Sequence, residues 1–406
     1  EPTRGLASRL QKWAESVQAI RSEDWLGRVG IGLLLVGLAF LFKYAVDVGW
    51  LVPSVRVGFG AVLGSVLLAG GLRSYETHRR VGQTFLGGSS ATFYATVFAA
   101  YQLYDLLAYP YAFAAMGAIT IFTFVLAIQQ DDALLGVVGL AGGLATPFLL
   151  YTDAGSLPGF VAYLCLVLSG GMAIYLVRGW RSLLWTSVVG GWATLLVAAA
   201  NLPWADRTAM DLWSLQAGLT FAWLGLGGVP VVRAVLHQRA PGRWAVPRLG
   251  GSEWLQRELD KRPPYLWVNA SPLLALGGMR MIWSDVGDGT WGVLAVAGAV
   301  LYAAAAIAVR HWDLRRYASA HALAAAVLLA YGLSEVTGGS TLLLALSAEA
   351  AAVIVIGSQL PDATLRRAGH GLAVLVAVWW VGRIWEPEPG AVRLVSAAAL
   401  SELAVV

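Results

Sequence analysis

The chain has a single cysteine, Cys165, and few charged residues, with Asp, Glu, Lys and Arg making up 13% of its 406 residues. One cysteine excludes a disulfide within the chain, and soluble domains carry roughly 25% charged residues. Catalytic and nucleotide-binding motifs are missing, and the five histidines lack the spacing of zinc ligands. These absences exclude a disulfide-stabilised secreted domain and give no sign of a soluble enzyme, a metal site or a cofactor.

Hydrophobic residues are abundant instead, at 58% of the chain. They form about fourteen stretches of about 20 residues, each long enough to cross the ~30 Å hydrocarbon layer as a helix. The sequence therefore predicts an all-α, polytopic integral membrane protein. The expected spans are residues 29–46, 54–72, 83–104, 110–128, 133–151, 157–177, 182–200, 210–236, 265–283, 290–309, 318–334, 340–358, 367–384 and 391–406.

Most Lys and Arg residues fall in every second gap between these stretches. Because basic residues are retained on the cytoplasmic side, the pattern predicts a cytoplasmic N-terminus. The net charge of +4 is spread over short loops beside the spans. We therefore expect contacts with membrane lipids, including anionic head groups, and no nucleic-acid partner. The basic residues expected inside include Arg73, Arg79, Arg80, Arg178, Arg181, Arg310, Arg315, Arg316, Arg366 and Arg367.

Read in pairs, the spans predict about seven repeated αα-hairpins, each with an acidic residue near its outer turn. The first and last match best, because Lys43 and Asp47 in one correspond to Arg383 and Glu386 in the other. Each charge pair shares a helix face near the outer boundary. They are candidates for an anion site or, alternatively, are interfacial pairs, and acidic turns are themselves common in outer loops.

Two segments do not have the character of spans. Residues 1–24 have an apolar stripe typical of an interfacial amphipathic helix, with the end of a coiled coil as the alternative. Residues 238–264 form a basic cytoplasmic loop with a short amphipathic helix. This loop divides a first membrane domain, 25–237, with about eight spans, from a second, 265–406, with about six. The chain begins without Met and ends inside an apolar run, so we expect a longer full-length protein.

Several motifs carry a family resemblance. The run from Trp25 to Gly30 leads to Phe42-Lys43-Tyr44-Ala45-Val46-Asp47 and Gly49-Trp50-Leu51-Val52-Pro53, and a glycine-rich stretch follows from Gly136 to Pro147. Over about residues 24–200 the chain resembles the bacterial predicted membrane proteins of domain of unknown function 2339, and more loosely beyond. The resemblance implies a multi-spanning protein of the bacterial cytoplasmic membrane and implies no activity.

Four polar residues inside or near expected spans are candidates for a buried polar or transport site: Glu349, Gln216, Glu402 and Arg280. An ionisable group at membrane depth is costly unless it is paired or neutral, and such a group often marks a functional site. The alternative is an interhelical hydrogen bond that fixes packing. Arg280 lies deeper than the outer boundary and needs a partner, for which Asp285 or a lipid phosphate are candidates.

Small residues suggest where helices approach closely. Gly60 and Gly64 are four residues apart, as are Gly139 and Gly143, a spacing typical of close contacts between membrane helices. Pro147 follows in the same span as the second pair. We expect it to break that helix and open a cavity, as in transporters with discontinuous helices.

Three functional classes remain open. A transporter, flippase or channel-like protein for a small solute or lipid is favoured by the number of spans and by Glu349. A non-catalytic envelope scaffold or assembly partner is the alternative, and an intramembrane enzyme acting on a lipid-linked substrate is the third. A polar cavity reaching Glu349 or residues 139–147 would favour transport. Oligomeric state and protein partners are left open by the sequence.

Overall fold

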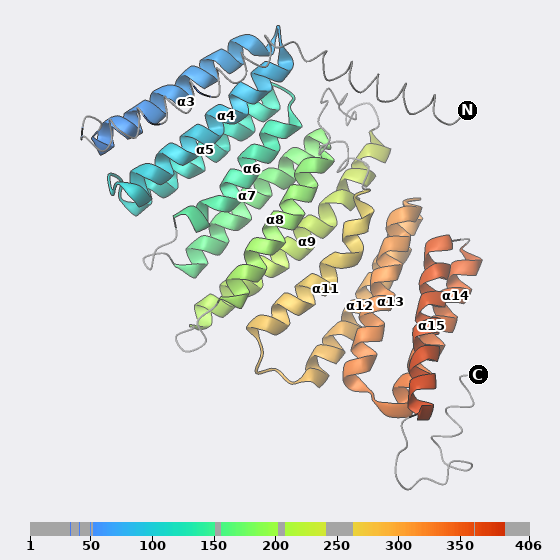
Figure 1. The fold of residues 1–406 in the computed structure, drawn as a ribbon. Helices are drawn as coiled ribbons and strands as arrows, with labels where there is room; N and C mark the ends of the chain where they lie inside the picture. The colour runs from blue at the N-terminus through green and yellow to red at the C-terminus, as the bar shows by residue number, and fades with distance from the viewer. Residues whose placement is uncertain are drawn as a thin grey trace, which may run out of the picture.

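The computed structural model describes residues 52–150, 156–201, 208–240, 263–360 and 362–385, together with Leu33, Phe40 and Gly49. In this part of the chain the secondary structure consists of helices without strands (Figure 1). They are α3 (Pro53–Tyr75), α4 (Arg79–Phe98), the π-helix η1 (Ala99–Leu103), α5 (Tyr109–Gln129), α6 (Ala133–Leu149), α7 (Leu157–Arg178), α8 (Arg181–Ala200), α9 (Ala209–Arg239), α11 (Tyr265–Ile282), α12 (Asp288–His311), α13 (Arg315–Val336), α14 (Gly339–Gln359) and α15 (Ala363–Trp385).

Every expected span between residues 54 and 384 coincides with a helix, and the range 83–104 is divided between α4 and η1. Eight helices of the described chain are long and apolar enough to cross a membrane: α3, α5, α7, α8, α9, α12, α13 and α14. The segments expected at 1–24, 29–46, 238–264 and 391–406 lie essentially outside the described residues. An all-helical architecture with several helices long and apolar enough to cross a membrane is thus confirmed for the described residues, whereas fourteen spans, the hairpin repeats and a cytoplasmic N-terminus stay predictions.

Local sequence explains where several helices begin and end. The carboxylate of Asp132 accepts hydrogen bonds from the backbone N–H groups of Leu134 and Leu135 and so caps α6. Thr208 and Asp211 form a reciprocal capping box at the start of α9. At the end of α7, Gly179 adopts a φ of +75°, which favours glycine.

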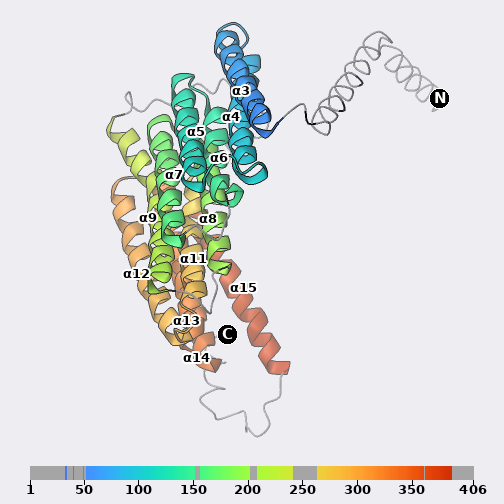
Figure 2. The same ribbon diagram turned by 90° about the vertical axis from the view of Figure 1, so that its left-hand side faces the viewer.

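The helices follow one another in a row, from α3 and α4 at one end to α14 and α15 at the other (Figures 1 and 2). The main hydrophobic core runs through α6, α7, α8 and α9 and includes Trp267, Ala275 and Ile282 of α11. The core therefore continues across the boundary that we expect at residues 238–264. The division into two membrane domains stays a prediction.

Consecutive helices differ in how extensively they pack on one another, and the seven repeated hairpins stay a prediction. The most extensive contacts of neighbouring helices are α12 with α13, α3 with α4, α14 with α15 and α5 with α6, whereas α4 with α5, α11 with α12 and α13 with α14 pack less. Glycine explains one of these contacts. A Cβ atom at Gly332 would lie 2.8 Å from the backbone oxygen of Gly292, so α12 and α13 approach backbone to backbone. The acidic turns, from which the hairpins were predicted, therefore do not indicate which consecutive helices pack most extensively.

The turns α3–α4, α5–α6 and α7–α8 lie on the same side of the row, and two arginines join them. Arg178 at the end of α7 lies 2.8 Å from Asp131, measured from Nη1 to Oδ1, in the turn between α5 and α6. Arg79 at the start of α4 donates to the backbone oxygen of Asp131 at 3.0 Å. Arg79 and Arg178 were expected on one side of the membrane, and this arrangement is consistent with that expectation. It also explains why an acidic turn lies among basic ones.

Candidate functional site

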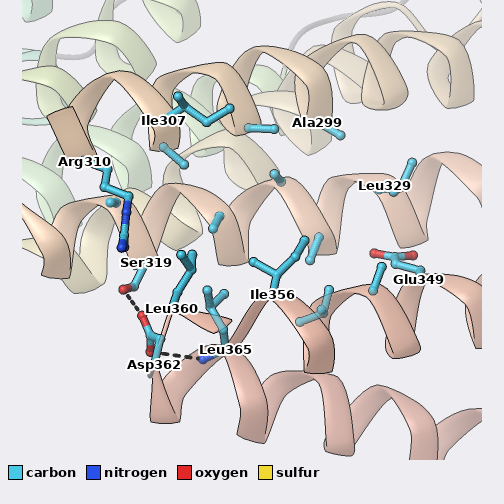
Figure 3. Close-up of a pocket in the computed structure, with 18 of the residues that line it drawn as sticks. Ala299, Ile307, Arg310, Ser319, Leu329, Glu349, Ile356, Leu360, Asp362 and Leu365 are labelled. Carbon is cyan, nitrogen blue, oxygen red and sulfur yellow. Dashed lines mark hydrogen bonds between the residues drawn. The ribbon is translucent and has the colours of Figure 1, made fainter. Parts of the chain in front are cut away.

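A cavity of about 410 Å³ lies between α12, α13 and α14, and we call it the α12–α14 groove. Small and aliphatic side chains form nearly all of its walls (Figure 3). The polar residues among them are Arg310, Ser319, Glu349 and Asp362. The groove is lined by Ala299, Val300, Ala303, Ala306, Ile307, Arg310, Ala318, Ser319, Ala322, Ala325, Ala326, Leu329, Glu349, Ala352, Val353, Ile356, Leu360, Asp362 and Leu365.

Two features of the packing explain the space. Alanine side chains project only a methyl group into the region where three helices meet. In addition, α14 packs mainly on α15 and only slightly on α13, so it does not close over α12. Leu360 lies eleven positions after Glu349, and at 1.5 Å of rise per helical residue the groove extends for roughly 16 Å along α14.

Glu349 is the polar group at one end of the groove, opposite the end near Leu360. It lies in the middle of α14, and its residue is only 6% exposed. Neither carboxyl oxygen has a hydrogen-bond partner among the described residues. Burying an ionised carboxylate without a partner in an apolar wall costs a free energy on the order of several kcal/mol. This position therefore calls for a neutral acid or for a ligand that satisfies it.

Arg310, Ser319 and Asp362 lie at the other end of the groove (Figure 3). The carboxylate of Asp362 caps α15, accepting from the backbone N–H of Thr364 at 2.8 Å. Its second oxygen accepts a hydrogen bond from the hydroxyl of Ser319. Asp362 thus joins the start of α13 to the start of α15 and holds this end of the groove together. Its negative charge is directed to the N-terminus of a helix.

Arg280 belongs to a separate ionic cluster where α11, α12 and α13 meet. Its Nη1 lies 2.7 Å from Oε1 of Glu335, and its Nη2 lies 2.6 Å from Oδ1 of Asp288. Its guanidinium also donates to the hydroxyl of Tyr331. We expected Asp285 or a lipid phosphate as the partner, and the structure adds two carboxylates and a phenol. The cluster is distinct from the groove, so Arg280 and Glu349 are not brought together.

Gln216 forms two side-chain hydrogen bonds and does not line the α12–α14 groove. Its Oε1 accepts from the indole N–H of Trp283 at 3.0 Å, and its Nε2 donates to the hydroxyl of Thr220 at 3.2 Å. Gln216 therefore links α9 to the end of α11, the arrangement expected of a packing residue. The remaining candidates, Glu402, Lys43, Asp47, Glu386 and the side chain of Arg383, lie outside the described residues.

Two glycines of α6 lie at close helix contacts. A Cβ at Gly143 would lie 2.9 Å from a methyl group of Thr120 and 3.0 Å from one of Val167. A Cβ at Gly139 would lie 3.0 Å from a methyl of Thr123. Both glycines therefore face neighbouring side chains.

The expected break at Pro147 is absent from α6. The helix continues through Pro147 to Leu149, because a proline in the last turn forfeits only one backbone hydrogen bond. The hydroxyl of Thr146 donates to the backbone oxygen of Gly142 at 2.9 Å in the same turn.

Two glycines of α3 face α4. A Cβ at Gly64 would lie 2.6 Å from the ring of Phe93, and one at Gly60 would contact Thr96. The hydroxyl of Ser89 donates to the backbone oxygen of Gly64 at 2.8 Å. Small residues therefore allow a polar contact between these helices as well as close packing.

Glu349 was identifiable from the sequence, whereas the groove around it was not. Arg310 was assigned only to membrane topology, and Ser319 and Asp362 were not singled out. The available signal was the density of alanine in α12, α13 and α14, which predicts close packing as readily as a groove. Among the described residues, no group of three or more His, Cys, Asp or Glu residues is placed to hold a metal ion.

Comparison with protein families places most of the chain in one family model. The family model described as "Predicted membrane protein (DUF2339)" matches residues 22–404. No curated protein and no solved structure matches the chain. The match extends well beyond residue 200, where the motif resemblance was loose.

Proposed function

We propose that this chain, which belongs to the domain of unknown function 2339 family of predicted membrane proteins, moves a lipid-like amphiphile along the α12–α14 groove. The observation that carries this proposal is the unpartnered carboxyl group of Glu349 in the wall of an otherwise aliphatic cavity. A protein that only needed to fill its interior would gain stability from an apolar residue there. Retaining an acid at this depth is typical of transport pathways.

The proposed path uses the two polar regions of the groove in sequence. A polar head group enters at the end formed by Arg310, Ser319 and Asp362, while its apolar chain lies against the alanine walls. The carboxyl oxygens of Glu349 are covered by neighbouring atoms near the middle of α14. A head group in transit, which has lost its water at this depth, would bind the carboxyl once that side chain turns toward the groove. Sites near the bilayer midplane are a common feature of membrane transporters.

Translocation in liposomes tests the proposal. Full-length protein is reconstituted with a phospholipid that carries a fluorescent nitrobenzoxadiazole group, and dithionite quenches the label in the outer leaflet. We expect the protein to accelerate exchange between leaflets. Glu349→Leu should lower the rate by roughly tenfold, because it removes the hydrogen-bonding group from this part of the path. Ser347→Ala, two residues away on the same helix and outside the groove, should leave the rate unchanged.

A second pair of variants tests the groove itself. Ala352 lines the groove, whereas Ala351, its neighbour in α14, does not, and both residues are exposed. Ala352→Phe should block exchange, and Ala351→Phe should not, although both add the same ring to the same helix. Exchange at the rate of protein-free liposomes, or equal rates for these two variants, would contradict the proposal.

The packed region from α6 to α9 favours a second candidate, a non-catalytic envelope scaffold. Leu140, Leu164, Leu183 and Leu215 are fully buried there, which leaves a filled interior. A scaffold predicts no acceleration of lipid exchange. The liposome experiment therefore separates the two candidates.

A further inference from the structure

We propose that the α12–α14 groove binds one acyl chain of an anionic phospholipid from the surrounding membrane, with the lipid phosphate beside Arg310. This inference rests on the proposed function and specifies its substrate class. It depends on three observations: the length of the groove, the chemistry of its walls and the charge at its open end.

The length matches one leaflet of the bilayer. Between Glu349 and Leu360 the groove extends for roughly 16 Å. The hydrocarbon layer is ~30 Å thick, so one leaflet contributes about 15 Å. A lipid whose phosphate lies at the Arg310 end therefore has a chain that reaches the depth of Glu349. A small polar solute would leave most of this length empty.

The walls suit a hydrocarbon chain. Between the polar end and Glu349, the groove is lined by alanine, valine, isoleucine and leucine. Such a surface offers dispersion contacts and no directional hydrogen bonds, which fits a flexible methylene chain better than a peptide, whose backbone groups need partners. The alanines provide the width, because their side chains leave room between the helices.

Positive charge concentrates at the end where the phosphate would lie. Arg310 lines the groove, and Arg315, Arg316, Arg366 and Arg367 are exposed in adjacent helix ends. The contact of Ser319 with Asp362 places the start of α13 beside the start of α15, so the helix starts that carry the other four arginines lie next to the Arg310 end of the groove.

Two acids at this end are already engaged. Asp313 pairs with Arg315 at 3.3 Å, and Asp362 caps α15. The surplus of cations favours an anionic head group over a zwitterionic one.

Native mass spectrometry of the purified full chain tests this inference without any transport step. The protein is titrated with phosphatidylglycerol and with phosphatidylcholine of identical acyl chains. We expect preferential binding of phosphatidylglycerol and a roughly tenfold loss of that binding in Arg310→Gln, because one charge-assisted contact is removed. Arg80→Gln, which removes an exposed arginine from α4, is the matched control and should bind as the wild type does.

The groove variants identify the part of the lipid that is bound. Ala352→Phe should reduce the binding of both lipids, and Ala351→Phe should not. Equal binding of the two lipids, or full binding by Arg310→Gln, would overturn the inference. A disulfide between Ala322→Cys and a cysteine placed within residues 391–406, in a Cys165→Ser chain, would also overturn it, because the groove would then hold the chain's own segment.

The two proposals fail separately. Selective binding of phosphatidylglycerol without lipid exchange would leave this inference standing and contradict the proposed function. Lipid exchange that is independent of head-group charge would support the proposed function and contradict this inference.

Discussion

The guanidinium of Arg280 on α11 lies 2.7 Å from the carboxylate of Glu335 at the end of α13, measured from Nη1 to Oε1. Asp288 in the first turn of α12 contacts the same guanidinium, so one cation joins three helices. The Glu335 side chain is 19% exposed and that of Arg280 is 37% exposed. The contribution of such a half-buried pair to stability lies between that of an exposed ion pair, which is small, and that of a fully buried pair, which is offset by the cost of removing both charges from water. The ionic cluster therefore fixes the positions of α11, α12 and α13 relative to one another.

We expect Arg280→Gln and Glu335→Gln each to lower the melting temperature of the purified protein, and the double variant to lower it by less than their sum. This non-additivity is the signature of a direct interaction. Arg315→Gln and Asp313→Asn provide the control, because that pair is 3.3 Å apart with side chains 78% and 82% exposed. An exposed pair contributes little to stability, so the effects of these two substitutions should be small and additive. Strict additivity for Arg280 and Glu335 would contradict the assigned contact.

A second prediction concerns the contact of α6 with α5 and α7. Gly143→Leu should destabilise the protein by about 1–3 kcal/mol, the usual cost of overpacking, because its side chain meets Thr120 and Val167. Gly117→Leu is the matched control, since a Cβ at Gly117 has no atom within 4 Å. Both variants are measured by thermal or denaturant unfolding in the same detergent. Equal stability of the two would mean that Gly143 faces lipid.

Much of the helical architecture was predictable because membrane spans are long and uninterrupted. The expected span 157–177 and the helix Leu157–Arg178 differ by a single residue at one end. The pairing of helices was not predictable from the acidic turns. It depends on which faces meet, as where Gly292 opposes Gly332, and residues far apart in the sequence decide that.

The candidate site was predictable in part for a similar reason. An isolated acid such as Glu349 is visible in any apolar stretch, because burying it is costly. The groove around it requires the relative positions of three helices. Ala303, Ala322 and Ala352 lie on different helices, and each alone is an ordinary small residue of a membrane protein. The same holds for Arg280. Its position in a span indicated that it needs a partner, but the sequence did not indicate that Glu335 is one.

Membrane orientation is tested by labelling single cysteines in a Cys165→Ala chain. Thr77 lies in the turn between α3 and α4, and Gly338 precedes α14; both are exposed. With a cytoplasmic N-terminus, Thr77→Cys should be protected from an impermeant thiol reagent in intact cells, and Gly338→Cys should react. Permeabilised cells, in which both should react, control for accessibility. Reaction of Thr77→Cys in intact cells would reverse the orientation.

The stability of Glu349 variants separates a packing role from a ligand role. A packing residue has a partner, so Glu349→Leu would leave that partner unsatisfied and destabilise the protein by about 1 kcal/mol. The carboxyl of Glu349 has no hydrogen-bond partner among the described residues. We therefore expect Glu349→Leu to raise the stability of the lipid-free protein by about 1–2 kcal/mol, because it removes a buried polar group that nothing satisfies. Glu349→Gln, which keeps a polar group in place, should change stability little. Chemical unfolding of the delipidated protein measures both, and a clear loss of stability in Glu349→Leu alone would assign the residue to packing instead.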